Sequence, residues 1–198
     1  MSQQKRIRRS MLFQIACLGL AAVLLAASLG GCMTYTPLRL AQLKEFERKV
    51  RSKYPLSIVE CKYARGVWVD INVTKSGFDE ESAYIILGYL TEIVRDEEFI
   101  EDFLAFHEEQ GKKHPKEAGL WYPPHLYLNL MEWGETSYSY RFTAYPYEEN
   151  YNSARPKDSY TWEGYAKWYG TIISKDGPLY DVELSPEKVE EAIKRYAE

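Results

Sequence analysis

The sequence predicts an α+β domain, with a largely antiparallel sheet of about five strands and helices packed on one face. Three observations indicate this class. In several short runs apolar residues recur at every second position, which is the period of a half-buried strand. In longer runs they recur every three or four positions, as in an amphipathic helix. Most strand runs come in pairs joined by turns, and such pairs favour antiparallel sheets.

A helix and a hairpin come first. Residues 38–54 are predicted to be helical, residues 56–63 and 67–74 to be strands, and residues 64–66 to be the turn between them. The helix prediction depends on an apolar stripe at three- and four-residue spacing: Leu40, Leu43, Phe46, Val50 and Tyr54. In the second strand Val67, Val69, Ile71 and Val73 alternate with more polar residues.

A long helical segment follows the hairpin. Asp79 is a suitable N-cap for residues 80–110, which contain no proline. A polar break at residues 95–98 interrupts the apolar stripe, so the segment is either two helices or one helix with a bend near Asp96. Gly111 and Pro115 are expected to end it.

Three more strands and a final helix complete the domain. The strands are predicted at residues 126–131, 138–145 and 165–173, where apolar and aromatic residues alternate with polar ones. Ser185 is suited to cap the last helix, and Pro186 to occupy its first position. Hydrophobic residues make up 45% of the 198 residues and charged residues 27%, as in folded proteins. We expect residues 38–198 to form a single domain.

The N-terminus has the build of a secretory signal peptide: four basic residues, then an apolar or small run at 15–29. The run ends in Leu29-Gly30-Gly31-Cys32, which resembles the lipobox of bacterial lipoproteins. The resemblance covers residues 1–32 only. It implies removal of residues 1–31 and attachment of lipid to Cys32, with residues 32–37 as a short tether. An uncleaved membrane helix is the alternative. Arg8 and Arg9 also resemble a twin-arginine export signal.

The resemblance implies a protein anchored by lipid on the extracytoplasmic face of the cell membrane, or of an outer membrane if the cell has two. From Cys32 onward the chain has 21 basic and 29 acidic residues, which argues against a nucleic acid partner. The charge is uneven, with +4 on residues 38–54 and −12 on residues 55–198. The first helix is therefore predicted either to face anionic lipid headgroups or to be an ordinary solvated helix.

Two irregular segments, 111–124 and 146–164, are rich in aromatic residues. Loops longer than about 12–15 residues are usually functional or disordered. Tyr and Trp combine an apolar face with a polar tip, which suits a sugar ring or a peptide. The candidate ligand-binding residues are Trp121, Tyr122, Tyr147, Tyr151, Tyr160 and Trp162. Loops that simply pack over the sheet are the alternative.

No catalytic signature is intact in the sequence. Gly111 stands where a zinc-protease motif beginning at His107 needs its second histidine, so no metal or cofactor is predicted. His107 is either a lone acid/base group or a helix surface residue, and Cys61 is expected to be a small buried hydrophobe. The sequence thus favours a non-catalytic module that binds an envelope protein, peptide or glycan. The alternative is a cell-envelope hydrolase whose active site assembles only in three dimensions.

Overall fold

A sheet of seven strands forms the centre of the described structure, in the order β1-β2-β3-β4-β5-β6-β7. The strands are β1 (Tyr35–Pro37), β2 (Ile58–Ala64), β3 (Trp68–Lys75), β4 (His125–Glu132), β5 (Tyr138–Ala144), β6 (Trp168–Ile172) and β7 (Val182–Leu184). Every neighbouring pair is antiparallel except β3 and β4, which run parallel. A parallel pair needs a long crossover connection, and two helices provide it here.

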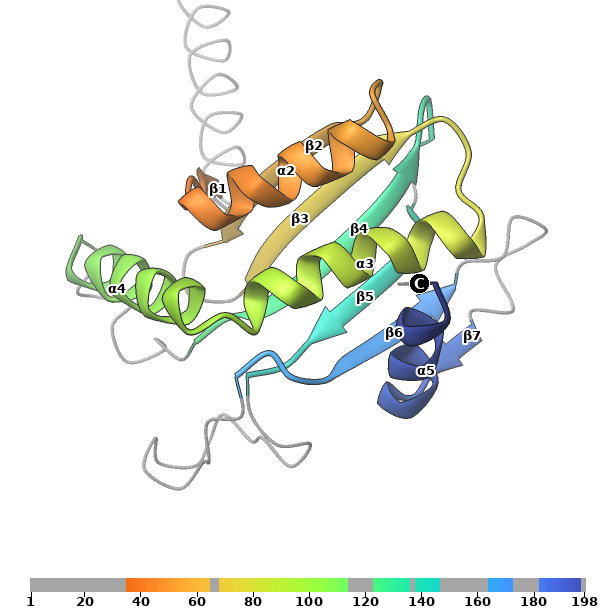
Figure 1. Ribbon diagram of the computed structural model, residues 1–198. Helices are drawn as coiled ribbons and strands as arrows, with labels where there is room; N and C mark the ends of the chain where they lie inside the picture. Colours follow the sequence, from red (N-terminus) through yellow and green to blue (C-terminus); the bar gives the residue numbers. More distant parts are fainter. Residues whose placement is uncertain are drawn as a thin grey trace, which may run out of the picture. The chain divides into compact units, whose positions relative to one another are not determined.

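The computed structural model describes residues 35–64, 68–113, 123–135, 138–146, 164–172 and 182–196 (Figure 1). The chain divides into two units, Met1–Thr34 and Tyr35–Glu198, and all the described residues belong to the second. The predicted export segment and the predicted lipid site Cys32 therefore lie outside the described residues. Among the residues described, no helix combines the length and the apolar character needed to cross a bilayer.

Four helices are described: α2 (Ala41–Lys53), α3 (Glu80–Val94), α4 (Glu97–Lys113) and α5 (Pro186–Tyr196). Helices α2, α3 and α5 lie along one face of the sheet (Figure 1). Helix α4 continues from α3 and lies at the left of the view. The sheet residues of the core are fully buried, among them Val69, Ile71, Val73, Leu126, Leu128 and Leu130. The α+β class, a mostly antiparallel sheet and helices on one face are confirmed.

The helix pair begins and bends where the sequence predicts. Asp79 accepts a hydrogen bond from the Ser82 backbone N–H at 2.8 Å, and the Asp79 N–H donates to the Ser82 hydroxyl oxygen at 3.2 Å, which completes a capping box. Hydrogen bonding to Ser82 lowers the pKa of Asp79. The chain bends between Val94 and Glu97, where the Asp96 carboxylate accepts from the Glu98 N–H at 2.8 Å. The alternative of two helices is the correct one.

Three predictions about the elements are wrong. The described sheet has seven strands instead of about five, because β1 and β7 span three residues each, too few to show a period of two. Residues 35–37, assigned to the tether, pair with β2 as strand β1. Gly111 does not end the helix, since α4 continues to Lys113, where Lys112 and Lys113 form ion pairs one turn back.

Candidate functional site

The sheet face opposite the described helices carries aromatic and polar side chains, and we call it the polar face. Side chains alternate across a strand, so residues between the core positions must point to this side. On β3 the polar-face residues include Trp68, Asp70 and Asn72, which alternate with the buried Val69, Ile71 and Val73. On β4 they are His125, Tyr127, Asn129 and Met131. This face is the part of the described sheet with the most varied chemistry.

Five aromatic side chains follow one another across one end of the polar face, and we call them the aromatic row: Trp68, His125, Tyr127, Tyr145 and Tyr169. The ring centroids of Trp68 and Tyr127 are 6.4 Å apart, and those of His125 and Tyr127 are also 6.4 Å apart. His125 lies 4.7 Å from Tyr145, which lies 5.4 Å from Tyr169. All four contacts are edge-to-face, the geometry preferred by aromatic pairs. The row therefore connects residues of β3, β4 and β6 with the residue that follows β5.

Burial shifts the titration of two members of the row. It lowers the pKa of His125 from 6.5, so the imidazole is neutral at neutral pH and has one donor and one acceptor nitrogen. Burial also raises the pKa of Tyr127, which keeps its hydroxyl protonated. The row thus offers uncharged rings with polar edges.

A polar network extends the site along the sheet. The Asn129 side-chain amide donates to Asn72 Oδ1 at 2.9 Å and to Asp70 Oδ1 at 3.2 Å, while Trp68 Nε1 donates to Asp70 Oδ2 at 2.9 Å. Asn129 is buried, and its own Oδ1 accepts no hydrogen bond from the described residues. The network holds Trp68 of the aromatic row in place through Asp70.

Arg141 lies across the same face. Its guanidinium is 4.0 Å from the centroid of the Tyr127 ring and 5.2 Å from that of Tyr138, and Nη1 donates to the Tyr138 hydroxyl at 3.0 Å. Stacking of this kind is characteristic of arginine, whose planar group is more weakly hydrated than an ammonium. Arg141 therefore presents an ordered positive charge beside the aromatic row.

The two predicted aromatic loops begin or end beside the row. Strand β4 follows the first loop, and β5 and β6 flank the second. In the sheet register Leu126 pairs with Ala144, and Ala144 pairs with Trp168, so these three strand ends meet at one end of the sheet. The six predicted binding residues Trp121, Tyr122, Tyr147, Tyr151, Tyr160 and Trp162 lie outside the described residues. The structure therefore shows only that the two loops join the sheet close to each other.

Cys61 and His107 do not have the properties of a catalytic pair. Burial raises the pKa of the Cys61 thiol to about 12, with smaller contributions from Glu47 and Glu60, so the nucleophilic thiolate is scarce at neutral pH. His107 is buried, and its Nδ1 lies 2.7 Å from the Tyr63 hydroxyl. The prediction of a helix surface residue was wrong, because His107 faces the core beside Phe103. Within the described ranges no three His, Cys, Asp or Glu side chains gather as metal ligands would.

The aromatic row was not predicted from the sequence. The period of two that identified the strands also places Trp68 and Tyr127 opposite the core, but it does not reveal which strands are neighbours.

The protein is thus an α+β domain in which one face of the sheet carries aromatic and polar side chains at the end where the two predicted aromatic loops join the strands. The chain matches no protein-family model, no curated protein and no solved structure.

Proposed function

We propose that the mature protein is a lipoprotein, held through lipid on Cys32 at the extracytoplasmic face of the cell membrane. Residues 38–198 act as a single domain that binds a peptide or glycan of the cell envelope without catalysis. The ligand contacts the aromatic row and the loops that join the sheet beside it, including Trp121, Tyr151 and Trp162.

The aromatic row carries this proposal. Ligand sites combine apolar and aromatic surface with a few placed polar groups. The row supplies the rings, while Arg141 and the Asn129 network supply charge and hydrogen-bonding groups on the same face. A site at the loop end of a rigid sheet is also where binding residues are commonly found. The raised pKa of Cys61 supports the non-catalytic form of the proposal, because it leaves this thiol inert.

The test mixes residues 33–198 with isolated cell envelopes and measures both co-sedimentation and any released fragments by mass spectrometry. We expect co-sedimentation without new fragments. Tyr145→Ala should weaken binding roughly ten-fold, since aromatic residues at a binding centre typically contribute this much. Trp133→Ala is the matched control. Both side chains are exposed, Tyr145 by 40% and Trp133 by 49%, but Trp133 lies in the turn after β4, at the other end of that strand.

Each part of the proposal can fail separately. Fragments that appear only with the protein would overturn the non-catalytic role and favour a hydrolase. Equal binding by Tyr145→Ala and the unchanged protein would exclude the aromatic row as the site. A mature protein whose Cys32 peptide carries no lipid by mass spectrometry would contradict the anchor.

A further inference from the structure

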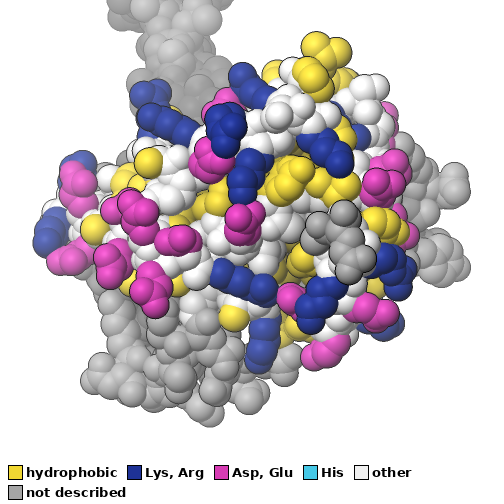
Figure 2. All heavy atoms as spheres, in the orientation of Figure 1, with side chains coloured by type: hydrophobic (Ala, Val, Ile, Leu, Met, Phe, Trp, Pro, Cys, Tyr) yellow, Lys and Arg dark blue, Asp and Glu magenta, His cyan; other side chains and the backbone are white. Residues whose placement is uncertain are grey.

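The outer surface of α2 is a ridge of basic side chains. Lys44, Arg48 and Arg51 recur at three- and four-residue spacing, opposite the buried Leu43, Phe46 and Val50. The acids of α2 are less exposed than the neighbouring arginines. The side chains of Arg48 and Arg51 are 70% and 50% exposed, against 42% and 36% for Glu45 and Glu47. Lys and Arg gather over α2 in Figure 2, whereas Asp and Glu predominate over α4.

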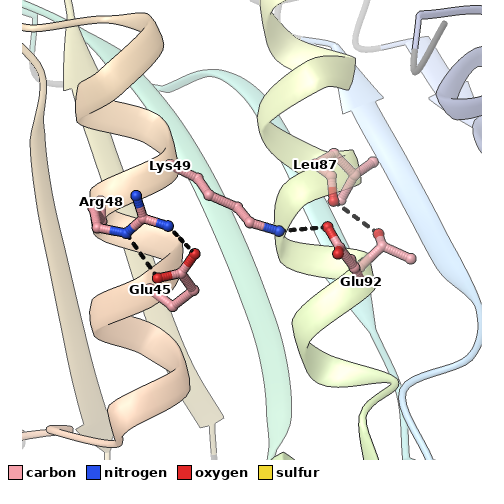
Figure 3. Close-up of polar contacts among 6 residues, drawn as sticks. Glu45, Arg48, Lys49, Leu87 and Glu92 are labelled. Atoms are coloured by element: carbon pink, nitrogen blue, oxygen red, sulfur yellow. Dashed lines mark hydrogen bonds and ion pairs between the residues drawn. The ribbon is translucent and has the colours of Figure 1, made fainter.

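The ion pairs of α2 leave this surface available. Arg48 pairs with Glu45, and Lys49 reaches across to Glu92 of α3 at 2.6 Å (Figure 3). Arg51 pairs with Glu47. Exposed pairs such as these contribute little to stability, so an incoming phosphate can replace the carboxylate. Lys44 and Lys53 have no ion pair with any described residue.

Two open hollows lie along the ridge. One has a volume of about 390 Å³ and is lined by Arg48, Lys49, Ser52, Lys53 and Tyr89. The other has a volume of about 500 Å³ and is lined by Lys44, Glu47, Arg48, Arg51 and Ser52. Each hollow brings ammonium and guanidinium donors together, and these groups form strong charge-assisted hydrogen bonds to phosphate oxygens.

Chain length places α2 near the proposed anchor. Tyr35, the first residue of β1, is three residues after Cys32, a distance of at most about 10 Å in extended chain. Helix α2 begins four residues after β1 ends. Beyond the C-terminal end of α2, Leu56 is 86% exposed in the turn before β2. The basic ridge therefore lies between the N-terminal end of α2, which is the end nearer to Cys32 in sequence, and the protruding side chain of Leu56.

We propose that the ridge of α2 docks on the anionic headgroups of the same bilayer that holds the lipid on Cys32, with Leu56 entering the headgroup layer. This inference rests on the proposed lipid anchor. Lipid on one residue fixes only the distance to the membrane, whereas the ridge fixes which side of the domain faces it. Each basic side chain near an anionic surface favours docking by about five-fold.

The experiment uses the full lipidated protein, purified from membranes and reconstituted into two kinds of vesicle: phosphatidylcholine alone, and phosphatidylcholine mixed with phosphatidylglycerol. Mass spectrometry first confirms lipid on the Cys32 peptide. An amine-reactive reagent then measures the modification rate of each lysine. We expect Lys44 and Lys53 to react several-fold more slowly on the anionic vesicles and to recover in high salt. Lys112 and Lys113 of α4 should react equally on both.

Charge reversal tests the ridge directly. The triple variant Lys44→Glu, Arg48→Glu, Arg51→Glu removes three basic residues, which should shift the docking equilibrium by about a hundred-fold and abolish the protection of Lys53. The control Lys112→Glu, Lys113→Glu, Lys188→Glu makes the same charge change on exposed residues of α4 and α5 and should keep it. If the reversed variant is unfolded by circular dichroism, glutamine at the same three positions replaces it.

The outcomes are separable. Equal lysine rates on the two vesicles, with lipid present on Cys32, would overturn the docking surface and leave the anchor intact. Slow reaction of Lys44 and Lys53 on both vesicles that does not recover in high salt would show that something other than anionic headgroups covers the ridge, and would also overturn the docking surface. An unmodified Cys32 would overturn the proposed anchor, and this inference with it.

Discussion

Single side chains on the polar face are held by several contacts at once. Arg141 stacks on Tyr127 and donates to Tyr138, while Asn129 bridges Asp70 and Asn72. A long side chain such as arginine loses rotamer freedom when it is ordered in this way. Because the folded sheet has already paid that entropy, a ligand that meets Arg141 does not need to order it again.

The buried position of His125 predicts a pH dependence of stability. Its folded-state pKa lies below 6.5, whereas an unfolded histidine titrates near 6.5. Between these values the unfolded chain binds more protons, so the free energy of unfolding should fall as pH decreases through 6.5 and level off below the folded pKa. NMR titration of the His125 ring checks the pKa directly. His125→Gln should remove this part of the pH dependence in denaturant unfolding, and a His125 ring that titrates at or above 6.5 would contradict the argument.

At the scale of elements, α5 packs against α3 on one face of the sheet. Tyr84 of α3 stacks on Tyr196 of α5 with ring centroids 6.0 Å apart and an interplanar angle of 11°. Gly88 lies four residues after Tyr84 on α3 and faces Ile193 of α5. A glycine inside a helix costs stability relative to alanine, because it has more conformational freedom to lose.

Gly88→Ala should therefore stabilise the domain by about 0.5–1 kcal/mol. A Cβ at this position would lie 3.7 Å from Ile193 Cγ2, which is an ordinary contact. Thermal unfolding measures the change. Gly170→Ala is the informative comparison, since its Cβ would lie 3.3 Å from Leu184 and Phe142 atoms in the β5–β7 region and should destabilise instead. A lower melting temperature for Gly88→Ala would show that α3 and α5 are already at closest approach.

The sequence predicts helices and strands correctly where the repeating pattern of apolar residues is long enough to be recognised. Val69, Ile71 and Val73 identify β3, and Asp79 marks the start of α3, because both depend on local periodicity or local hydrogen bonds. Strands β1 and β7 are held by pairing with neighbours instead of by a pattern of their own. The parallel register of β3 with β4 depends on residues more than fifty positions apart. For the same reason the aromatic row could not be assembled from the sequence, although Tyr145 and Tyr169 stand on either side of the irregular segment 146–164.

At the scale of the whole molecule, one apolar layer between the sheet and the helices holds the described elements together. Its members come from α2, α3, α4 and α5 and from strands on both sides of the parallel pair. Ile71 occupies the middle of β3, opposite Cys61 on one side and Leu128 on the other, and is completely buried. A substitution at Ile71 should therefore destabilise the whole domain.

Ile71→Ala should lower the free energy of unfolding by about 2–5 kcal/mol, because it leaves a cavity that the packed helices cannot fill. Ile58→Ala on β2 removes the same atoms from a side chain that is 41% exposed and should cost much less. Denaturant unfolding followed by both tryptophan fluorescence and circular dichroism measures the two variants. Coincident transitions support the proposed single domain, and separate transitions would contradict it.

The pair β3–β4, which is the only parallel pair among the described strands, also bears on how the chain folds. Within each of the groups β1–β3 and β4–β7, paired residues are at most 32 positions apart, against 57 between β3 and β4, so each group needs shorter loop closures than the joining of the two groups. Pairing of β3 with β4, which brings Trp68 opposite His125, closes a longer loop, because α3 and α4 lie between the two strands in sequence. Long-range pairing of this kind slows folding. We therefore expect the joining of these two halves to be the rate-limiting step, and until it is complete the inner edges of β3 and β4 are the part of the nascent protein most exposed to aggregation.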